Sequence, residues 1–351
     1  MFLIALIRYP TYQLFLTAVV ALIMTVILTP LWTRLLTVRS IGQQIRADGP
    51  EAHLVKQGTP TMGGVVILAS VAVASTLLGR MTPLGLTALL TAVACGLVGL
   101  ADDTSKVSHK RSLGLRARGK VALQALIALV LGAVAVNWLG ISTWVAIPLT
   151  GRGLDMGLGA LSIPLGQMTL KLPLLYIAFV LLIIVATTNA VNLTDGLDGL
   201  AAGTVSIVML AYAAIAFRQD HLDLALVAGA AGGACIGFIW YNVYPANIFM
   251  GDTGSLGLGG ALAALAILTK TELLLIMIGG IYVLETMSVI LQVAYFKATG
   301  GKRLFKMAPI HHHFEMLGWS ETKIMVRFWI ITGVIAGIGF AMYFVSAVRP
   351  G

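Results

Sequence analysis

The chain has 351 residues, of which 58% are hydrophobic and only 11% are charged, with a formal net charge of +9. Soluble domains carry about 25% charged residues, so this composition excludes an ordinary soluble protein and indicates a polytopic membrane protein. No polar stretch is long enough to fold separately, so residues 1–351 are expected to form one membrane domain. The basic charge needs no nucleic-acid partner, because membrane proteins collect Lys and Arg in cytoplasmic loops.

Long apolar runs occur throughout the chain. A membrane helix needs about 20 mostly apolar residues, and that template fits about ten times. The expected spans are 11–33, 61–79, 83–101, 120–139, 173–191, 199–217, 222–241, 256–269, 272–296 and 326–347. The first run lacks a basic start and a cleavage site, so it is interpreted as a retained span. The predicted fold class is an all-α integral membrane protein with about ten transmembrane helices.

Five polar loops fall on one side of this arrangement, namely 34–60, 102–119, 192–198, 242–255 and 297–325. These loops and the adjoining helix ends hold 16 of the 23 Lys and Arg residues. Because cytoplasmic loops carry the excess of basic residues, we place the five loops in the cytoplasm and both termini outside. The outward segment 140–172 has a strand-like run at 167–172 and is expected to form a short β-hairpin.

Three of the cytoplasmic loops contain five of the nine aspartates, namely Asp102, Asp103, Asp195, Asp198 and Asp252. Carboxylates at the rim of a bilayer are costly and usually have a function. The Asp102-Asp103 pair offers either ligands for a hard cation or a general base. Two further acids, in the loop 192–198, are three residues apart and would share a face if that segment were helical.

The remaining acid, Asp252, lies in a turn with Gly251 and Gly254, which would let backbone amides approach a ligand. The loop 34–60 ends in the segment Lys56-Gln-Gly-Thr-Pro-Thr61-Met-Gly-Gly, which suits an anion cradle as well as an ordinary helix start. Basic residues that follow Asp103 either set the topology or bind anionic head groups and phosphates.

Three consecutive histidines, His311, His312 and His313, lie in the loop 297–325. A zinc site is the first interpretation from composition, but no cysteine or second histidine cluster accompanies them. Consecutive residues in an extended or turn segment point in different directions, so hydrogen bonds to a phosphate or sugar are favoured. Carboxylates, cations, glycine-rich turns and an adjacent bilayer together indicate chemistry on a diphosphate with a lipid partner.

In its loop motifs the chain resembles the polyprenyl-phosphate N-acetylhexosamine-1-phosphate transferase superfamily. Four motifs carry the resemblance, namely Asp102-Asp103-x-x-Lys106, Asn192-Leu-Thr-Asp195-Gly-Leu-Asp198-Gly, Phe249-Met-Gly-Asp252-Thr-Gly-Ser255 and Pro309-Ile-His311-His312-His313-Phe-Glu315. The histidine motif and the segment from Lys56 are similar to the phospho-N-acetylmuramoyl-pentapeptide transferase family within it. The resemblance covers all five loops and leaves the segment 140–172 unmatched.

The resemblance implies Mg²⁺-dependent transfer of phospho-N-acetylmuramoyl-pentapeptide from UDP-MurNAc-pentapeptide to undecaprenyl phosphate. The products would be lipid I and UMP, the first membrane step of peptidoglycan biosynthesis at the bacterial inner membrane. Asp252 would bind Mg²⁺, and Asp102 and Asp103 would lie near the reacting phosphates. The implied substrate contacts are Lys56, Thr61, Lys106, Lys120, Asn192, Asp195, Asp198, Phe249, Gly251, Ser255, Gln292, His311, His312 and His313. The oligomeric state stays open, with a homodimer as one option.

Alternatives remain for the mechanism and for the function. A phosphate monoester has a second pKa near 6, so the lipid phosphate is largely a dianion at neutral pH and needs no strong base. Direct attack, with Asp102 or Asp103 orienting the phosphate, is therefore expected ahead of a covalent route through an aspartate. A related N-acetylglucosamine-1-phosphate transferase is the second candidate. An ion-coupled transporter is the third, but it would place its acids at mid-span rather than at helix ends.

Overall fold

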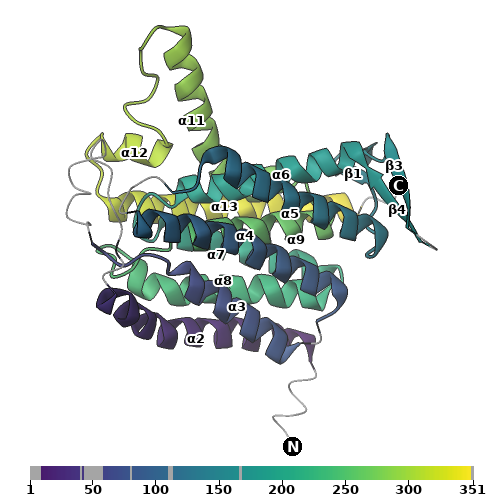
Figure 1. Cartoon of the computed structure of the whole chain (residues 1–351), viewed down its shortest axis with the longest axis horizontal. Coiled ribbons are helices and arrows are strands. Elements are labelled where there is room, and N and C mark those ends of the chain that lie inside the picture. Colours follow the sequence, from purple (N-terminus) through teal and green to yellow (C-terminus); the bar gives the residue numbers. More distant parts are fainter. Residues whose placement is uncertain are drawn as a thin grey trace, which may run out of the picture.

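The computed structural model describes residues 9–39, 42, 58–79, 81–109, 114–165 and 168–348. Most helices lie side by side in one bundle, and α11 projects from it (Figure 1). Across the described ranges the helices are α2 (Pro10–Val38), α3 (Gly64–Leu78), α4 (Pro83–Ser108), α5 (Ala117–Asn137), α6 (Leu174–Thr194), α7 (Leu200–Arg218), α8 (Leu222–Asn242), α9 (Gly251–Leu268), α10 (Leu275–Ile278), α11 (Gly280–Ala298), α12 (Ile310–Glu315) and α13 (Glu321–Val348).

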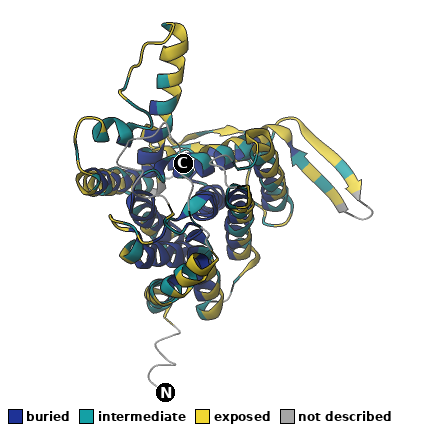
Figure 2. Cartoon of the chain, turned by 60° about the vertical axis from the view of Figure 1, so that its left-hand side comes forward, coloured by how far each residue is buried: buried dark blue, intermediate teal, exposed yellow. Residues whose placement is uncertain are grey.

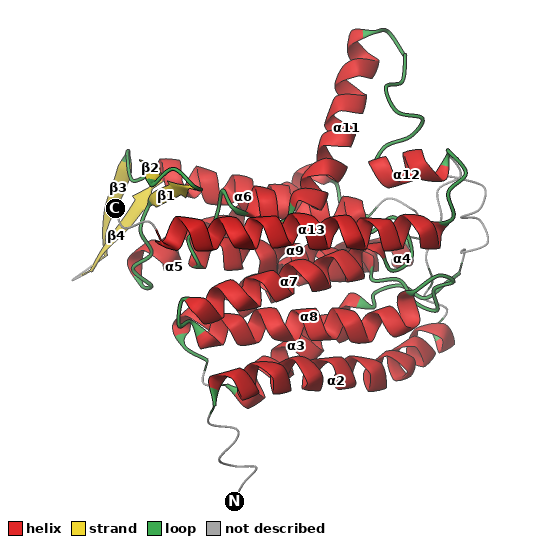
Figure 3. Ribbon diagram, turned by 180° about the vertical axis from the view of Figure 1, so that it is seen from behind, coloured by secondary structure: helices red, strands yellow, loops and turns green. Residues whose placement is uncertain are grey.

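The helices confirm the predicted all-α membrane fold. Among the described residues, nine helices are long and apolar enough to cross a membrane, and α3 is a shorter apolar helix of 15 residues. Each of the ten predicted spans coincides with described helix. The span predicted at 272–296 is interrupted, because α10 ends before Gly279 and α11 begins at Gly280. A glycine pair tolerates such a break, and beyond it α11 leaves the bundle (Figure 3).

Two predicted loops are shorter than expected because their helices are longer. The helix α4 continues to Ser108, so Asp102 and Asp103 lie on its last turns instead of in a loop. The helix α9 begins at Gly251 instead of residue 256, so Asp252 lies in its first turn. Contacts between these two ends, described below, stabilise the extra turns.

The segment 140–172 contains two β-hairpins, where one was predicted. Strand β1 (Trp144–Ile147) pairs antiparallel with β2 (Arg152–Asp155), and β3 (Ala160–Leu165) pairs antiparallel with β4 (Met168–Pro173). Both hairpins lie at the end of the bundle where α2 begins and α13 ends (Figure 1). They are largely exposed, as is α11 (Figure 2).

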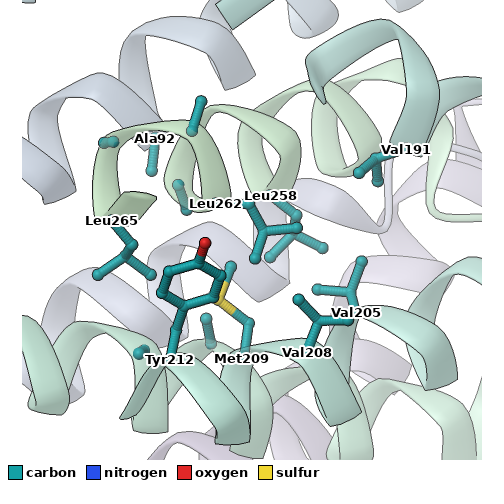
Figure 4. Packing of buried hydrophobic residues seen from close by; sticks show 14 of the residues in the cluster. Ala92, Val191, Val205, Val208, Met209, Tyr212, Leu258, Leu262 and Leu265 are labelled. Atoms are coloured by element: carbon teal, nitrogen blue, oxygen red, sulfur yellow. The ribbon is translucent and has the colours of Figure 1, made fainter. Parts of the chain in front are cut away.

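The helix α9 is the centre of the bundle, and every residue from Asp252 to Leu268 in it is buried. Its sequence is rich in glycine and alanine, which lets neighbouring helices approach closely. Figure 4 shows Leu258, Leu262 and Leu265 with the α7 side chains Met209 and Tyr212 beside them. A central helix packed on several sides cannot shift easily, so its first turn is a rigid support for Asp252.

Candidate active site

Three aspartates meet where the end of α4 crosses the beginning of α9. One carboxylate oxygen from each of Asp102, Asp103 and Asp252 lies within 4.8 Å of the others, and all three side chains are buried. The helix α5 begins beside this cluster and runs toward the hairpins, so the cluster lies at the opposite end of the bundle (Figure 1). The site is therefore at helix ends, as the sequence predicts, and not at mid-span.

Two lysines bridge two of the aspartates. Lys106 Nζ lies 2.7 Å from Asp102 Oδ2 and 3.1 Å from Asp252 Oδ1. Lys120 Nζ lies 3.2 Å from Asp102 Oδ1 and 2.6 Å from Asp252 Oδ2. The ammonium groups offset the repulsion between the carboxylates. Both lysine side chains remain partly exposed, at 29% and 19%, so a ligand entering from solvent can reach them.

Asp103 has a different set of partners, because it caps the first turn of α9. Its Oδ1 accepts from the backbone N–H of Asp252 at 3.1 Å, and its Oδ2 accepts from the N–H and Oγ1 of Thr253 at 2.9 Å and 2.7 Å. A carboxylate at a helix N-terminus satisfies unpaired amides and favours the helix dipole. Asp103 thus holds the backbone that carries Asp252.

The approach of Asp103 requires glycine at position 251. Gly251 has a φ of +74°, and a Cβ there would lie 2.7 Å from Asp103 Oδ2. From the sequence, Gly251 and Gly254 were expected to open the backbone to a ligand. In the structure they admit neighbouring groups instead, since a Cβ on Gly254 would meet the Met250 side chain and the Gly64 backbone.

A second layer of polar contacts holds Asp252. Asn192, in the last turn of α6, donates from Nδ2 to Asp252 Oδ1 at 3.0 Å and to Ser255 Oγ at 2.8 Å. One turn earlier in α6, Thr188 Oγ1 accepts from the buried Gln124 side chain at 3.0 Å, which ties α5 to α6. These bonds fix the helices that carry Lys120 and Asn192.

The segment before α3 is attached to the segment before α9. Phe249 N–H donates to Pro60 O at 2.8 Å, and Gly63 N–H returns a bond to Phe249 O at 2.9 Å. Thr61, which lies between Pro60 and Gly63 in sequence, is buried next to this junction, and Phe249 is half-buried. Lys56 lies outside the described residues.

Asp195 and Asp198 lie in the tight turn between α6 and α7. The segment is not helical, so the shared helical face considered from their spacing does not form. Asp198 Oδ2 accepts from Ala246 N–H at 3.0 Å and so ties this turn to the next loop. Burial raises the pKa of the Asp195 carboxyl well above its usual range, and the nearby Asp252 and Asp103 add to the rise.

The three histidines form the short helix α12 and not the extended or turn segment expected. His311 is fully buried, and its Nδ1 lies 3.0 Å from Glu285 Oε2. His312 Nδ1 lies 2.8 Å from Glu315 Oε2, and His313 Nδ1 accepts from the Lys306 N–H at 3.1 Å. The rings therefore face different partners.

A zinc site at these histidines receives no support from the geometry. In the part of the chain that the structure describes, the one group of three or more acidic, histidine or cysteine side chains close enough to share an ion is the aspartate trio. The trio supplies hard oxygen ligands, which suit Mg²⁺ better than zinc.

Comparison with known proteins identifies the family. Residues 85–270, from α4 to the end of α9, match the model of glycosyl transferase family 4. Residues 56–68 match signature 1 of phospho-N-acetylmuramoyl-pentapeptide-transferase. The phospho-N-acetylmuramoyl-pentapeptide-transferase of Rubrobacter xylanophilus is 48% identical over 333 residues, covering 95% of this chain and 98% of that protein. The chain belongs to the phospho-N-acetylmuramoyl-pentapeptide-transferase family.

Other relatives carry the same name. The protein of Desulforudis audaxviator is 47% identical over 92% of this chain and 96% of its own length, and that of Frankia casuarinae is 46% identical over 95% and 98%. These names favour the pentapeptide transferase over the N-acetylglucosamine-1-phosphate transferase and over the transporter. The family signature also spans Lys56 and Thr61, two of the predicted contacts.

The described hydrogen bonds of Gln292 are with the loop after α11 and not with the aspartate cluster. Its Oε1 accepts from the N–H groups of Leu304 and Phe305 at 3.0 Å and 2.8 Å, and its Nε2 donates to Phe305 O at 3.2 Å. The described bonds thus attach the loop after α11 to that helix.

Two residues of the site were not predicted. Thr253 holds Asp103, and its place in the motif Phe249-Met-Gly-Asp252-Thr-Gly-Ser255 was a signal in the sequence. Glu285 holds His311, and here a signal was present, because an ionisable side chain within the apolar run 272–296 is costly and usually has a role.

Proposed function

We propose that the protein transfers phospho-N-acetylmuramoyl-pentapeptide from UDP-MurNAc-pentapeptide to undecaprenyl phosphate, with lipid I and UMP as products. The family assignment supports this reaction. The observation that carries it is the buried trio of Asp102, Asp103 and Asp252, interleaved with the ammonium groups of Lys106 and Lys120. Carboxylates and ammonium groups gathered at the edge of a membrane suit a reaction that joins two anionic phosphates.

The donor set of the trio fits Mg²⁺. Carboxylate oxygens are the ligands this hard cation takes, and three of them lie within 4.8 Å of one another. Three carboxylates against two ammonium groups leave a formal charge of −1 in the cluster. We propose Asp252 as the main ligand and Asp102 as a second, because both Asp103 oxygens already hold α9. Mg²⁺, when bound, would neutralise charge on the diphosphate.

The chain's own residues then position the reactants. Lys106 and Lys120 can turn their partly exposed ammonium groups from the carboxylates to phosphate oxygens of the substrates. Asp102 orients the lipid phosphate, which attacks the sugar-linked phosphate directly and displaces UMP. Asn192 and Ser255 keep Asp252 in place throughout.

We propose the remaining predicted contacts with the donor as a group around this centre. Asp195, Phe249 and Gly251 border the site from the α6–α7 turn and the start of α9, and Asp198 supports that turn. We also propose donor contacts for Lys56, Thr61, His311, His312 and His313.

We place the protein in the bacterial inner membrane with the aspartate cluster at the cytoplasmic face. Both ends of the described chain lie at the hairpin end of the bundle, opposite the cluster (Figure 1). The excess of Lys and Arg in loops at the cluster end supports this orientation.

The proposed function is tested by UMP release from purified protein given UDP-MurNAc-pentapeptide. Release is expected only when undecaprenyl phosphate and Mg²⁺ are both present, with lipid I formed in equal amount. No lipid-dependent product would overturn the assignment. A second mixture contains the nucleotide substrate and Mg²⁺ but no lipid. Stoichiometric UMP release there, with a phosphorylated aspartate, would contradict direct attack and support the covalent route.

A further inference from the structure

A glutamate and a histidine are buried together next to the site, and the proposed chemistry leaves the glutamate without a role. Glu285, on α11, and His311, at the start of α12, both have 0% exposure. The Nδ1 of His311 lies 3.0 Å from Glu285 Oε2. The bond joins the projecting helix to the histidine segment, through two residues that are 26 positions apart in sequence.

The other nitrogen of the ring has no partner in the described structure. His311 Nε2 is buried and makes no hydrogen bond there, and the same holds for Glu285 Oε1. A Cβ added to Gly196 would lie 2.3 Å from Nε2, so the ring edge faces the turn that follows Asn192 and Asp195. A buried polar atom without a partner is unusual and calls for a ligand or another reason.

The charge of the pair determines what Nε2 can do. A buried carboxylate costs several kcal/mol unless it is paired. The basic group that the described structure places within reach of Glu285 is His311. A carboxylate and an imidazolium would satisfy each other here, with Nδ1–H donating to Glu285 Oε2 and a second N–H on Nε2. An imidazolium N–H is a strong donor to an anionic oxygen.

We propose that Glu285 is a positioning residue that holds His311 as an imidazolium and aims its Nε2–H at an oxygen of the donor diphosphate. Glu285 itself touches no substrate. The inference rests on the proposed transferase function, because the ligand of Nε2 is the donor of that reaction. A glycine at position 196 is needed for the ring to occupy this place.

The first experiment compares Glu285→Gln and Glu285→Leu, with His311→Gln and the double variant Glu285→Leu/His311→Gln. Leucine removes the acceptor, so kcat is expected to fall about 100-fold, whereas the glutamine oxygen still accepts Nδ1–H and limits the loss to about 10-fold. KM for undecaprenyl phosphate should stay within about twofold. The double variant should be no slower than His311→Gln, because Glu285 acts through the ring.

Glu272→Gln is the matched control, since Glu272 is another buried glutamate, paired with Lys270 beyond the far end of α9. Its kcat should equal that of the wild type. Wild-type kcat in Glu285→Leu, or losses that add in the double variant, would overturn the proposal. A fall in kcat of equal size in Glu272→Gln would show a general effect of removing buried acids and would also count against it.

The second experiment reads the ring directly and does not depend on turnover. Protein labelled with ¹⁵N-histidine is studied by solid-state NMR in lipid, and the His311 signals are those that disappear in His311→Gln. Two protonated ring nitrogens are expected in the wild type and one in Glu285→Leu. An unprotonated His311 nitrogen in the wild type would reject the ion pair, even if the transferase assay failed. A protonated pair without lipid-dependent UMP release would instead contradict the proposed function alone.

Discussion

The three aspartates of the cluster perform different tasks, and the partners of each side chain reveal the difference. Asp102 and Asp252 share the ammonium groups of Lys106 and Lys120. Both carboxylate oxygens of Asp103 instead accept hydrogen bonds from the first turn of α9. Removal of one carboxylate should therefore affect chemistry at one position and folding at another.

We expect Asp252→Asn to lower kcat at least about 100-fold with little change in stability, because a metal and lysine partner is lost while the backbone contacts remain.

Asp103→Asn should lower the free energy of unfolding by about 1.5–3 kcal/mol, since it removes a charge-assisted acceptor from buried amides. Kinetics and thermal denaturation in detergent measure both effects. Asp155→Asn, on exposed β2, is the control and should change neither. Equal destabilisation by Asp103→Asn and Asp155→Asn would contradict the capping role.

A pH effect is predicted at Asp195, which burial makes harder to ionise. The native pKa is raised well above the ordinary value of 3.8, so the folded protein holds this proton more tightly than the unfolded chain. Stability is therefore lost as pH rises from about 3.8 through the native pKa. Without Mg²⁺ and nucleotide, Asp195→Asn should match the wild-type Tm near the low end of this range. The variant should exceed the wild type increasingly toward neutral and alkaline pH. A Tm difference that is independent of pH would refute the prediction.

At the scale of elements, close helix contact positions the site. The ends of α4 and α9 meet where α4 carries a glycine, and a Cβ on Gly99 would lie 2.1 Å from the backbone oxygen of Asp252. The contact is with backbone, so it cannot be relieved by rotation of a side chain. Helix spacing and the position of Asp252 are thus set together.

Gly99→Ala should consequently lower both stability and activity. Forcing the two helices apart costs about 1–3 kcal/mol, and the shift displaces Asp252 from Lys106 and Lys120. The matched control is Gly337→Ala on α13, where an added Cβ meets nothing within 4 Å. This control should be neutral or more stable by up to about 1 kcal/mol through helix propensity. Thermal denaturation and UMP release test the pair, and unchanged activity in Gly99→Ala would argue against the close contact.

The whole molecule separates its two ends. One end gathers the aspartates, the bridging lysines and the histidine helix, and the other holds the hairpins and both ends of the described chain (Figure 1). The core between them is built around α9, and the exposed surface lies on the outer helices and α11 (Figure 2). Substrates must therefore meet at one face.

The orientation is tested with alkaline phosphatase, which is active only outside the cytoplasm. A fusion after Gly351 should be active, because both termini are expected outside. A fusion after Gly300, just beyond α11, should be inactive, because loop 297–325 is expected in the cytoplasm. This orientation is expected because cytoplasmic loops carry an excess of Lys and Arg, and such loops lie near the cluster end. The reverse pattern would invert the proposed orientation and place the aspartates outside.

The sequence alone determined the ten apolar spans, the polar loops between them and the resemblance of their motifs to a transferase family. Hydropathy is a property of consecutive residues, and so it can be read without a fold. Tertiary structure decided that α4 and α9 extend into the predicted loops, that Asp103 caps α9, and that Glu285 holds His311. These features depend on contacts between residues far apart in the chain, where the partner of a carboxylate is chosen by packing and not by its neighbours in sequence.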